Sequence, residues 1–219
     1  WLGLLLALPA LLLADRVSRF RPTPKTGMRL ITVNVDTRPL DVARALRPLN
    51  PDLVLMQETS VSCAAAAHTL GLQFVDGSDQ CVLSRWPMSP ARLSWPGPWQ
   101  PPQLVTMNNP DGRSLTLVNL RFAIPEVIAA VATLGGQWYT ERQRRNQYPA
   151  LQGLLNGRSP AVVCGDFNAL PFEVVLGPRF HDSWRGLRFG ATFPARLPAA
   201  RIDQCWGTRD VAVHGSGTY

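Results

Sequence analysis

A short apolar run that ends in polar side chains constrains this chain more than any other stretch. Residues 161–164 read Ala-Val-Val-Cys, which is typical of a strand buried on both faces. Gly165 follows and allows a sharp turn or the close approach of another backbone. Asp166 and Asn168 come next; if strand geometry continues, both point the same way and Phe167 between them points into the core. An acid and an amide at the mouth of a buried strand are costly unless a ligand or metal uses them, although a turn that caps a helix explains the same residues.

The composition is that of a globular protein with a basic surface. The chain has 219 residues, of which 46% are hydrophobic and 17% charged, so it can bury one large core and is not disordered. The formal net charge is +7, and because Lys25 is the only lysine, arginine carries almost all of it. Arginine favours an anionic partner, namely a phosphorylated substrate, nucleic acid or an anionic membrane surface. A genomic bias towards arginine explains the same composition equally well.

The four cysteines show no zinc-binding pattern, since the sequence contains no CxxC motif and no Cys/His cluster. Cys164 and Cys205 lie in apolar runs, and we predict that they are buried small hydrophobic residues. Cys63 and Cys81 can form a disulfide if the domain faces an oxidising compartment.

The chain begins with an apolar segment, Trp1 to Ala14, that contains no charge. It is shorter than the roughly 20 apolar residues that span a bilayer core. Because the chain does not begin with methionine, we interpret residues 1–14 as the end of a transmembrane helix. A signal-peptide core and a buried soluble helix are the alternatives. Residues 15–27 form a basic, proline-containing linker, and the positive-inside rule places that flank in the cytoplasm.

From residue 28 onward the sequence predicts a mixture of strands and helices. The expected strands are 29–35, 52–58, 72–75, 80–85, 103–108, 114–122, 161–164 and 201–206. The expected helices are 40–49, 61–70 and 137–156, and residues 86–102 are expected to form an ordered loop. This mixture predicts an α/β fold.

Polar side chains end, or interrupt, several of these apolar strands: Asn34, Glu58, Asp166 with Asn168, and Asp203. A cap or a turn explains each one singly, but together they predict one polar site at one edge of a sheet sandwich. Oxygen and amide ligands without histidine or thiolate favour Mg²⁺ or Mn²⁺ over zinc. Hydrolysis of phosphate esters needs such a set, in which a metal neutralises phosphoryl oxygens, a carboxylate activates water and amides bind the phosphate.

An ordered set of motifs resembles the endonuclease/exonuclease/phosphatase superfamily, whose fold is that of deoxyribonuclease I. The motifs are Val33-Asn34-Val35, Pro51 to Glu58, Leu83 to Pro87, Gly165 to Pro171, and Thr192-Phe193-Pro194 before Arg201-Ile202-Asp203. The resemblance implies a four-layer α/β sandwich, with two mixed β-sheets flanked by helices, over residues 28–219.

The resemblance also implies a role for each polar residue. Glu58 is expected to be the main metal ligand, with Asn34 beside it. Asp166 is expected to orient or deprotonate the attacking water, and Asn168 to bind the phosphate. Asp203 is expected to hold a catalytic histidine in its tautomer.

Two features depart from the family pattern. Arg121 stands where the family usually has His or Tyr; arginine can bind phosphate but cannot act as an acid near neutral pH. The family ends in a Ser-Asp-His motif that is absent before Tyr219, so we expect a domain truncated before its last strand and its catalytic histidine. His214 lies too early to replace that histidine, and we interpret His68 and His181 as structural.

These observations predict a membrane-tethered, Mg²⁺-dependent phosphoesterase, similar to the membrane-bound VanJ-like group of bacteria and located at the inner membrane. The expected partners are the membrane and a phosphorylated substrate: a lipid phosphate, nucleic acid or a small phosphoester. No protein partner is implied. The alternatives are an anchored nuclease, a catalytically impaired module that binds an anionic ligand, and a soluble α/β domain with scattered polar strand ends.

Overall fold

The computed structural model describes residues 27–91, 93, 95, 100–108, 112–122, 147–184, 190–192 and 201–218. The predicted membrane segment 1–14 and the first half of the predicted helix 137–156, residues 137–146, lie outside these residues. Within the described residues, no helix combines the length and the apolar character that crossing a membrane requires.

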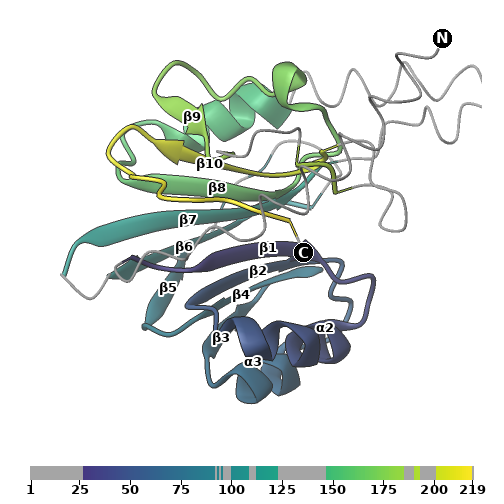
Figure 1. Cartoon of the computed structure of the whole chain (residues 1–219). Helices are drawn as coiled ribbons and strands as arrows, with labels where there is room; N and C mark the ends of the chain where they lie inside the picture. The colour runs from purple at the N-terminus through teal and green to yellow at the C-terminus, as the bar shows by residue number, and fades with distance from the viewer. Residues whose placement is uncertain are drawn as a thin grey trace, which may run out of the picture.

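Two mixed β-sheets form the centre of the described structure (Figure 1). The first sheet has the order β1-β2-β4-β3, with β1 Leu30–Asn34, β2 Leu53–Gln57, β3 Gln73–Asp76 and β4 Gln80–Ser84. The second has the order β5-β6-β7-β8-β10-β9, with β5 Met88–Ala91, β6 Gln103–Asn108, β7 Ser114–Arg121, β8 Ala161–Asp166, β9 Phe180–Asp182 and β10 Asp203–Thr208. The β1–β2 and β7–β8 pairs are parallel, and the other pairs are antiparallel.

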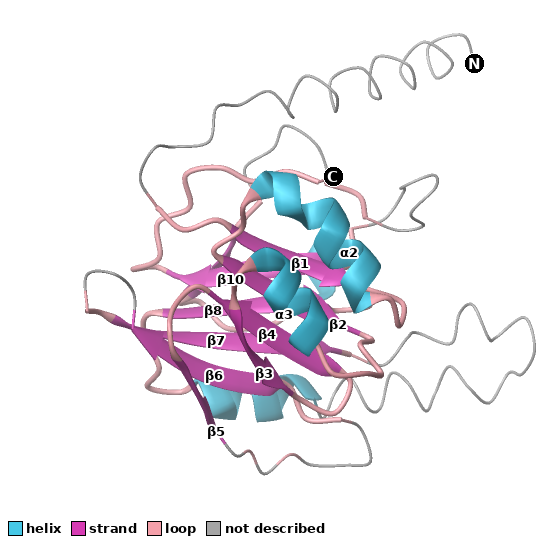
Figure 2. Ribbon diagram, turned by 90° about the horizontal axis from the view of Figure 1, so that it is seen from below, coloured by secondary structure: helices cyan, strands magenta, loops and turns pink. Residues whose placement is uncertain are grey.

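Helices cover the outer faces of the two sheets. The helix α2, Pro39–Leu46, continues into the 3₁₀ turn η1, Arg47–Leu49, and α3 spans Ala64–Leu70. Both helices lie across the first sheet (Figure 2). The α3 helix ends at Gly71, whose φ of 67° is the left-handed conformation expected at a glycine cap. A helix over residues 147–155 packs on the outer face of the second sheet.

Strand alternation divides the core into three clusters between four layers. In β2, Val54 and Met56 pack with the residues of α2 and α3, whereas Leu55 belongs to the cluster between the sheets. In β8, Val162 faces the first sheet and Val163 faces the outer helix. Because successive side chains of a strand point to opposite faces, each of these strands contributes apolar residues to the clusters on both sides of its sheet. This arrangement confirms the predicted four-layer α/β sandwich.

Two buried amide side chains connect the sheets beside the edge where β1 and β2 end. The Gln57 amide donates to Asn119 Oδ1 at 2.6 Å, and the Asn119 amide donates to the carbonyl oxygens of Met56 at 2.9 Å and Cys81 at 3.1 Å. Both amides have no exposed surface, and buried polar groups are stable when they are hydrogen-bonded. These bonds fix how the sheets are placed relative to each other.

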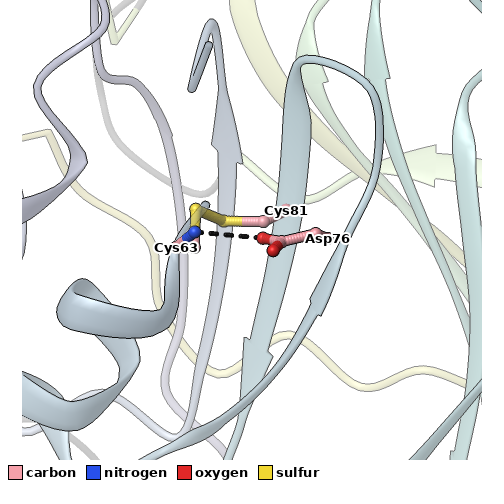
Figure 3. Close-up of side chains that lie close together, drawn as sticks. All are labelled: Cys63, Asp76 and Cys81. Atoms are coloured by element: carbon pink, nitrogen blue, oxygen red, sulfur yellow. Dashed lines mark hydrogen bonds between the residues drawn. A yellow bond between two sulfur atoms is a disulfide. The ribbon is translucent and has the colours of Figure 1, made fainter. Parts of the chain in front are cut away.

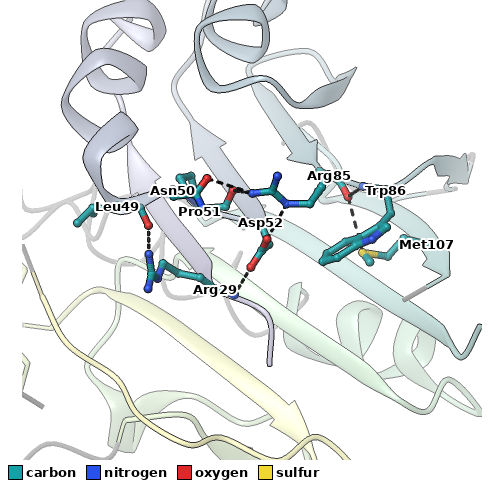
Figure 4. A network of polar contacts seen from close by, with 9 residues as sticks. Arg29, Leu49, Asn50, Pro51, Asp52, Arg85, Trp86 and Met107 are labelled. Atoms are coloured by element: carbon teal, nitrogen blue, oxygen red, sulfur yellow. Dashed lines mark hydrogen bonds and ion pairs between the residues drawn. The ribbon is translucent and has the colours of Figure 1, made fainter. Parts of the chain in front are cut away.

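An arginine–aspartate network holds the opposite end of the first sheet (Figure 4). The backbone N–H of Arg29 donates to Asp52 at 2.9 Å, and Arg85 Nε donates to the same carboxylate at 2.7 Å. Arg85 also donates to Asn50, which precedes β2. Arg85 belongs to one of the family-like motifs, and its position here gives it a structural role at the starts of β1 and β2.

The predicted loop over residues 86–102 is wrong in part, because β5 lies within it and pairs with β6. The β5 sequence, Met-Ser-Pro-Ala, lacks the β-branched residues that indicate a strand. Pro90 is tolerated because β5 is an edge strand, where the missing N–H needs no partner. Pairing with β6, rather than local preference, produces this strand.

All four cysteines form disulfides, Cys63–Cys81 and Cys164–Cys205. The first is the pairing that the sequence left open. The prediction that Cys164 and Cys205 are simple buried hydrophobic residues is wrong, because antiparallel pairing of β8 with β10 places them directly opposite each other.

Asp76 lies beside the Cys63–Cys81 disulfide (Figure 3). Its carboxylate accepts hydrogen bonds from the backbone N–H of Cys63 at 3.0 Å and from Ser62 Oγ at 2.7 Å. Because the two sulfur atoms are bonded to each other, this group is not a metal site. Asp76 instead connects β3 to the start of α3.

Removing the second disulfide with the double variant Cys164→Ala/Cys205→Ala should lower the free energy of unfolding. The expected loss is about 4 kcal/mol, because the cross-link joins residues separated by 41 positions and restricts the unfolded chain. Urea unfolding without reductant measures it. With reductant, the variant and the wild type should differ much less; an equal difference would contradict this explanation.

Candidate active site

Strand direction brings the predicted site residues to one edge of the sandwich. Parallel strands end at the same edge, so Asn34 at the end of β1 lies beside Glu58, which follows β2. In the second sheet, Arg121 and Asp166 end the parallel strands β7 and β8 as register partners. The antiparallel strand β10 begins at this edge, where Asp203 pairs with Asp166.

Strand alternation also sets the face on which the acidic residues lie. Cys164 and Cys205 pack in the cluster between the sheets. Asp166 lies two residues after Cys164, and Asp203 lies two residues before Cys205. Both aspartates therefore share the inner face. Since β1 contacts both β8 and β10, Asn34 reaches across from the first sheet.

Glu58 is the centre of the polar contacts. It follows β2 with a φ of 58°, in the left-handed region, which turns its side chain out of the strand alternation. Its Oε1 accepts a hydrogen bond from Asn34 Nδ2 at 2.7 Å and lies 2.8 Å from Arg121 Nη2. Asn34 Nδ2 is also 3.4 Å from Asp166 Oδ2, so one amide bridges two carboxylates.

Asp79 is a further residue of this site. Its Oδ2 lies 3.2 Å from Arg121 Nη1, so the guanidinium bridges two acids. Asp79 lies in the turn between β3 and β4. No sequence signal distinguished it from an ordinary turn residue, since only the packing of this turn beside the end of β7 brings it to Arg121.

The strand geometry predicted through Asn168 stops at Asp166. Asp166 Oδ1 accepts the backbone N–H of Asn168 at 2.9 Å, and Asn168 has a φ of 45°. The aspartate therefore makes a turn, which is the alternative that the sequence left open. Phe167 is fully buried beneath the outer helix, as predicted. The Asn168 side chain is buried and donates to the carbonyl oxygen of Phe122 at 2.8 Å.

Burial, and after it the negative charge of Asp203, raise the pKa of Asp166 to about 7, although the N–H of Asn168, the Asn34 amide and the Arg121 charge oppose this rise. Burial also raises the pKa of Asp203, and the charge of Glu58 adds to this effect, although the Thr192 hydroxyl opposes it. Acids held this close, away from water, destabilise each other's ionised form.

In the metal-free protein, the high pKa of Asp166 should make stability depend on pH. The unfolded chain ionises this group near 3.8, whereas the folded chain holds its proton up to about 7. The stabilising contribution is therefore complete below pH 3.8 and is lost as pH rises through 7, by about 2–4 kcal/mol. Urea unfolding at pH 5 and pH 8 with a chelator measures this loss, and the loss should be smaller in Asp166→Asn. An equal pH dependence in both proteins would contradict it.

The donor set fits a hard divalent cation. Glu58, Asp166 and Asp203 offer carboxylate oxygens and Asn34 an amide, the ligands that Mg²⁺ and Mn²⁺ prefer. Among the described residues, Asp203 Oδ1 is buried without a hydrogen-bond partner. A cation would relieve the repulsion that raises the pKa values of Asp166 and Asp203.

The comparison with known families decides the class of protein. The sequence model of the Endonuclease/Exonuclease/phosphatase family matches residues 31–219. The chain belongs to this family. All the residues of the candidate site lie within that match, and the name of the family covers enzymes that hydrolyse phosphate esters.

Solved structures of the family share the fold of this chain. The 3' phosphatase NExo from Neisseria, bound to a product DNA hairpin, is 17% identical with a TM-score of 0.56, covering 84% of this chain and 87% of that one. An AP endonuclease from Archaeoglobus fulgidus is 20% identical with a TM-score of 0.54, covering 82% and 85%. A family protein from Leptotrichia buccalis is 15% identical with a TM-score of 0.56, covering 82% and 87%. No curated protein matches this chain. At these identities the likeness establishes the deoxyribonuclease I-like fold.

Proposed function

We propose that this family member hydrolyses phosphate esters with a divalent metal ion, Mg²⁺ or Mn²⁺, from a membrane-anchored position. The observation that carries the proposal is the meeting of Glu58, Asn34, Asp166 and Asp203 at one edge of the sandwich. Carboxylates and an amide that meet at one edge can supply both ligands for a hard cation and a base for water.

Each residue has a separate task in this proposal. Glu58 holds the metal with Asn34 beside it, and the bound ion supplies positive charge that neutralises phosphoryl oxygens. Asp166 takes the proton of the attacking water, for which its place beside the Asn34 amide at the edge of the sandwich is suitable. Arg121 and Asn168 bind phosphoryl oxygens, for which the forked guanidinium of Arg121 is well shaped.

The test of this function is a set of phosphate esters offered to the purified full-length protein. We expect hydrolysis of a phosphomonoester or a phosphodiester that a chelator abolishes and that Mg²⁺ or Mn²⁺ restores. Glu58→Gln should lose it, whereas Asp41→Asn, an exposed change on α2, should not. Hydrolysis that survives complete chelation, or that Glu58→Gln leaves intact, would contradict the proposal.

A lipid phosphate is the substrate that an anchored enzyme would meet most readily, and the apolar segment 1–14 motivates the anchor. The test compares the rates at which the protein hydrolyses a detergent-solubilised lipid phosphate and a water-soluble phosphoester with the same headgroup. Preference for the soluble ester would remove the lipid proposal and leave the phosphoesterase proposal intact.

A nuclease is the second candidate, because the Neisseria structure holds a DNA hairpin and the chain carries a net charge of +7. A nuclease makes several phosphate contacts, so its binding of DNA should weaken steeply with salt concentration. DNA binding that stays flat between low and physiological salt would exclude this candidate.

We further propose that the domain faces an oxidising compartment. Both of its disulfides are long-range cross-links, and disulfides are rare in reducing cytosol. Two such cross-links outweigh the four basic residues of the linker, which alone favoured the cytoplasmic side. Thiol alkylation of protein taken directly from cells should modify no cysteine without reductant and all four with it; four reactive thiols without reductant would place the domain in the cytoplasm.

A further inference from the structure

The predicted metal ligand Glu58 already carries a positively charged partner within the protein. Arg121 Nη2 lies 2.8 Å from Glu58 Oε1, the same oxygen that Asn34 contacts at 2.7 Å. The metal and the guanidinium therefore require the same carboxylate.

Arg121 has a second anchor that does not depend on Glu58. Its Nη1 lies 3.2 Å from Asp79 Oδ2, and the Asp79 side chain is only 17% exposed. When a metal ion takes the Glu58 carboxylate, Asp79 still holds the guanidinium at the edge of the sandwich where β8 ends with Asp166. Both acids reach Arg121 from the first sheet, whereas Arg121 itself ends β7 in the second.

The guanidinium also has unused binding capacity. Among the described residues, Arg121 Nε is buried without a hydrogen-bond partner. A buried N–H without an acceptor is costly, and an oxygen supplied by a ligand would satisfy it. Phosphoryl oxygens suit this group because they accept two parallel bonds from one guanidinium.

We propose that Arg121 occupies Glu58 as an internal cation until a divalent ion displaces it, and that Asp79 then holds the freed guanidinium to bind the phosphoryl group of the substrate. This inference rests on the proposed function. It makes metal binding a condition for tight phosphate binding, because the same arginine leaves the metal ligand and joins the substrate. It also makes Asp79 a positioning residue.

The proposal predicts opposite effects on two affinities when the arginine is neutralised. Arg121→Gln removes the competitor from Glu58, and it also removes a positive charge that repels the dication. We expect Mn²⁺ to bind roughly tenfold more tightly to this variant in calorimetric titration of chelator-treated protein. Inorganic phosphate should bind roughly tenfold more weakly to the Mn²⁺-saturated variant than to the wild type.

Arg44→Gln is the matched control, because it removes one positive charge from an exposed side chain on α2. It should leave both affinities within about twofold, since an exposed charge is screened by solvent and salt. Arg121→Lys is the second variant. It keeps the charge but cannot bridge two carboxylates, so Mn²⁺ should bind with an affinity between those of the wild type and Arg121→Gln.

The outcomes separate this inference from the proposed function. Equal or weaker Mn²⁺ binding by Arg121→Gln, with folding verified by thermal unfolding, would overturn the role of Arg121 and leave the metal proposal intact. Failure of every protein to bind Mn²⁺ would overturn both. An arginine with only a structural role would lower both affinities when replaced, whereas tighter metal binding with weaker phosphate binding supports the exchange.

Discussion

Asp166→Asn should lower kcat/KM for phosphate-ester hydrolysis by about 1,000-fold, the range in which loss of a general base falls. The carboxamide has nearly the same shape and can still accept the backbone N–H that Asp166 Oδ1 accepts from Asn168. It cannot take a proton from water. The fall should therefore appear in kcat, with little change in the KM of the substrate.

This variant should also be more stable than the wild type at pH 8 in the absence of metal. Replacing the charge removes a buried carboxylate that Asp203 repels. A loss of activity together with a gain in stability distinguishes a carboxylate that takes part in catalysis from one that only supports the fold. Asp41→Asn on α2 is the control for charge. Activity within tenfold of the wild type in Asp166→Asn would contradict the assignment of Asp166 as the base.

Gly165→Ala should destabilise the protein by at least about 4 kcal/mol, a loss as large as those that severe packing and backbone defects cause. Gly165 has a φ of 145°, and a Cβ there would lie 1.9 Å from the carbonyl oxygen of Leu120. Leu120 is its register partner in β7, so the two central strands would have to separate. The next pair along these strands is Arg121 with Asp166, and the site would open with them.

Gly157→Ala is the control for the effect of backbone conformation alone. Gly157 has a φ of 71°, and a Cβ there meets no atom within 4 Å, so the expected cost is about 1 kcal/mol. Urea unfolding of both variants isolates the contribution of the steric clash. Similar losses in the two variants would show that close approach of β7 and β8 does not explain Gly165.

Several parts of the fold were predictable because they depend on neighbours in the sequence. The continuous apolar runs of β2 and β8 predict strands that are buried on both faces, and Gly71 predicts the end of α3. Glu58 and Asp166 were predictable as site residues because each is a polar residue at the end of one of these apolar runs. Their meeting at one edge follows from the parallel direction of β1 and β2 and of β7 and β8.

Other features had no local signal. The β5 strand exists because β6 offers a free edge, and the Cys164–Cys205 disulfide exists because β8 and β10 pair in one register. Asp79 joins the site only because the β3–β4 turn packs beside the end of β7. Each of these depends on which distant segments are placed together.

The sequence by itself determined the α/β class, the family and the candidate residues Asn34, Glu58, Asp166 and Asp203, because strand alternation and short motifs are local properties of the chain. Only the tertiary structure decided how these groups act on one another. The raised pKa of Asp166 depends on burial and on Asp203, and the occupation of Glu58 depends on Arg121 from the other sheet. Coulomb and desolvation energies depend on distances in space, which the order of residues along the chain does not contain.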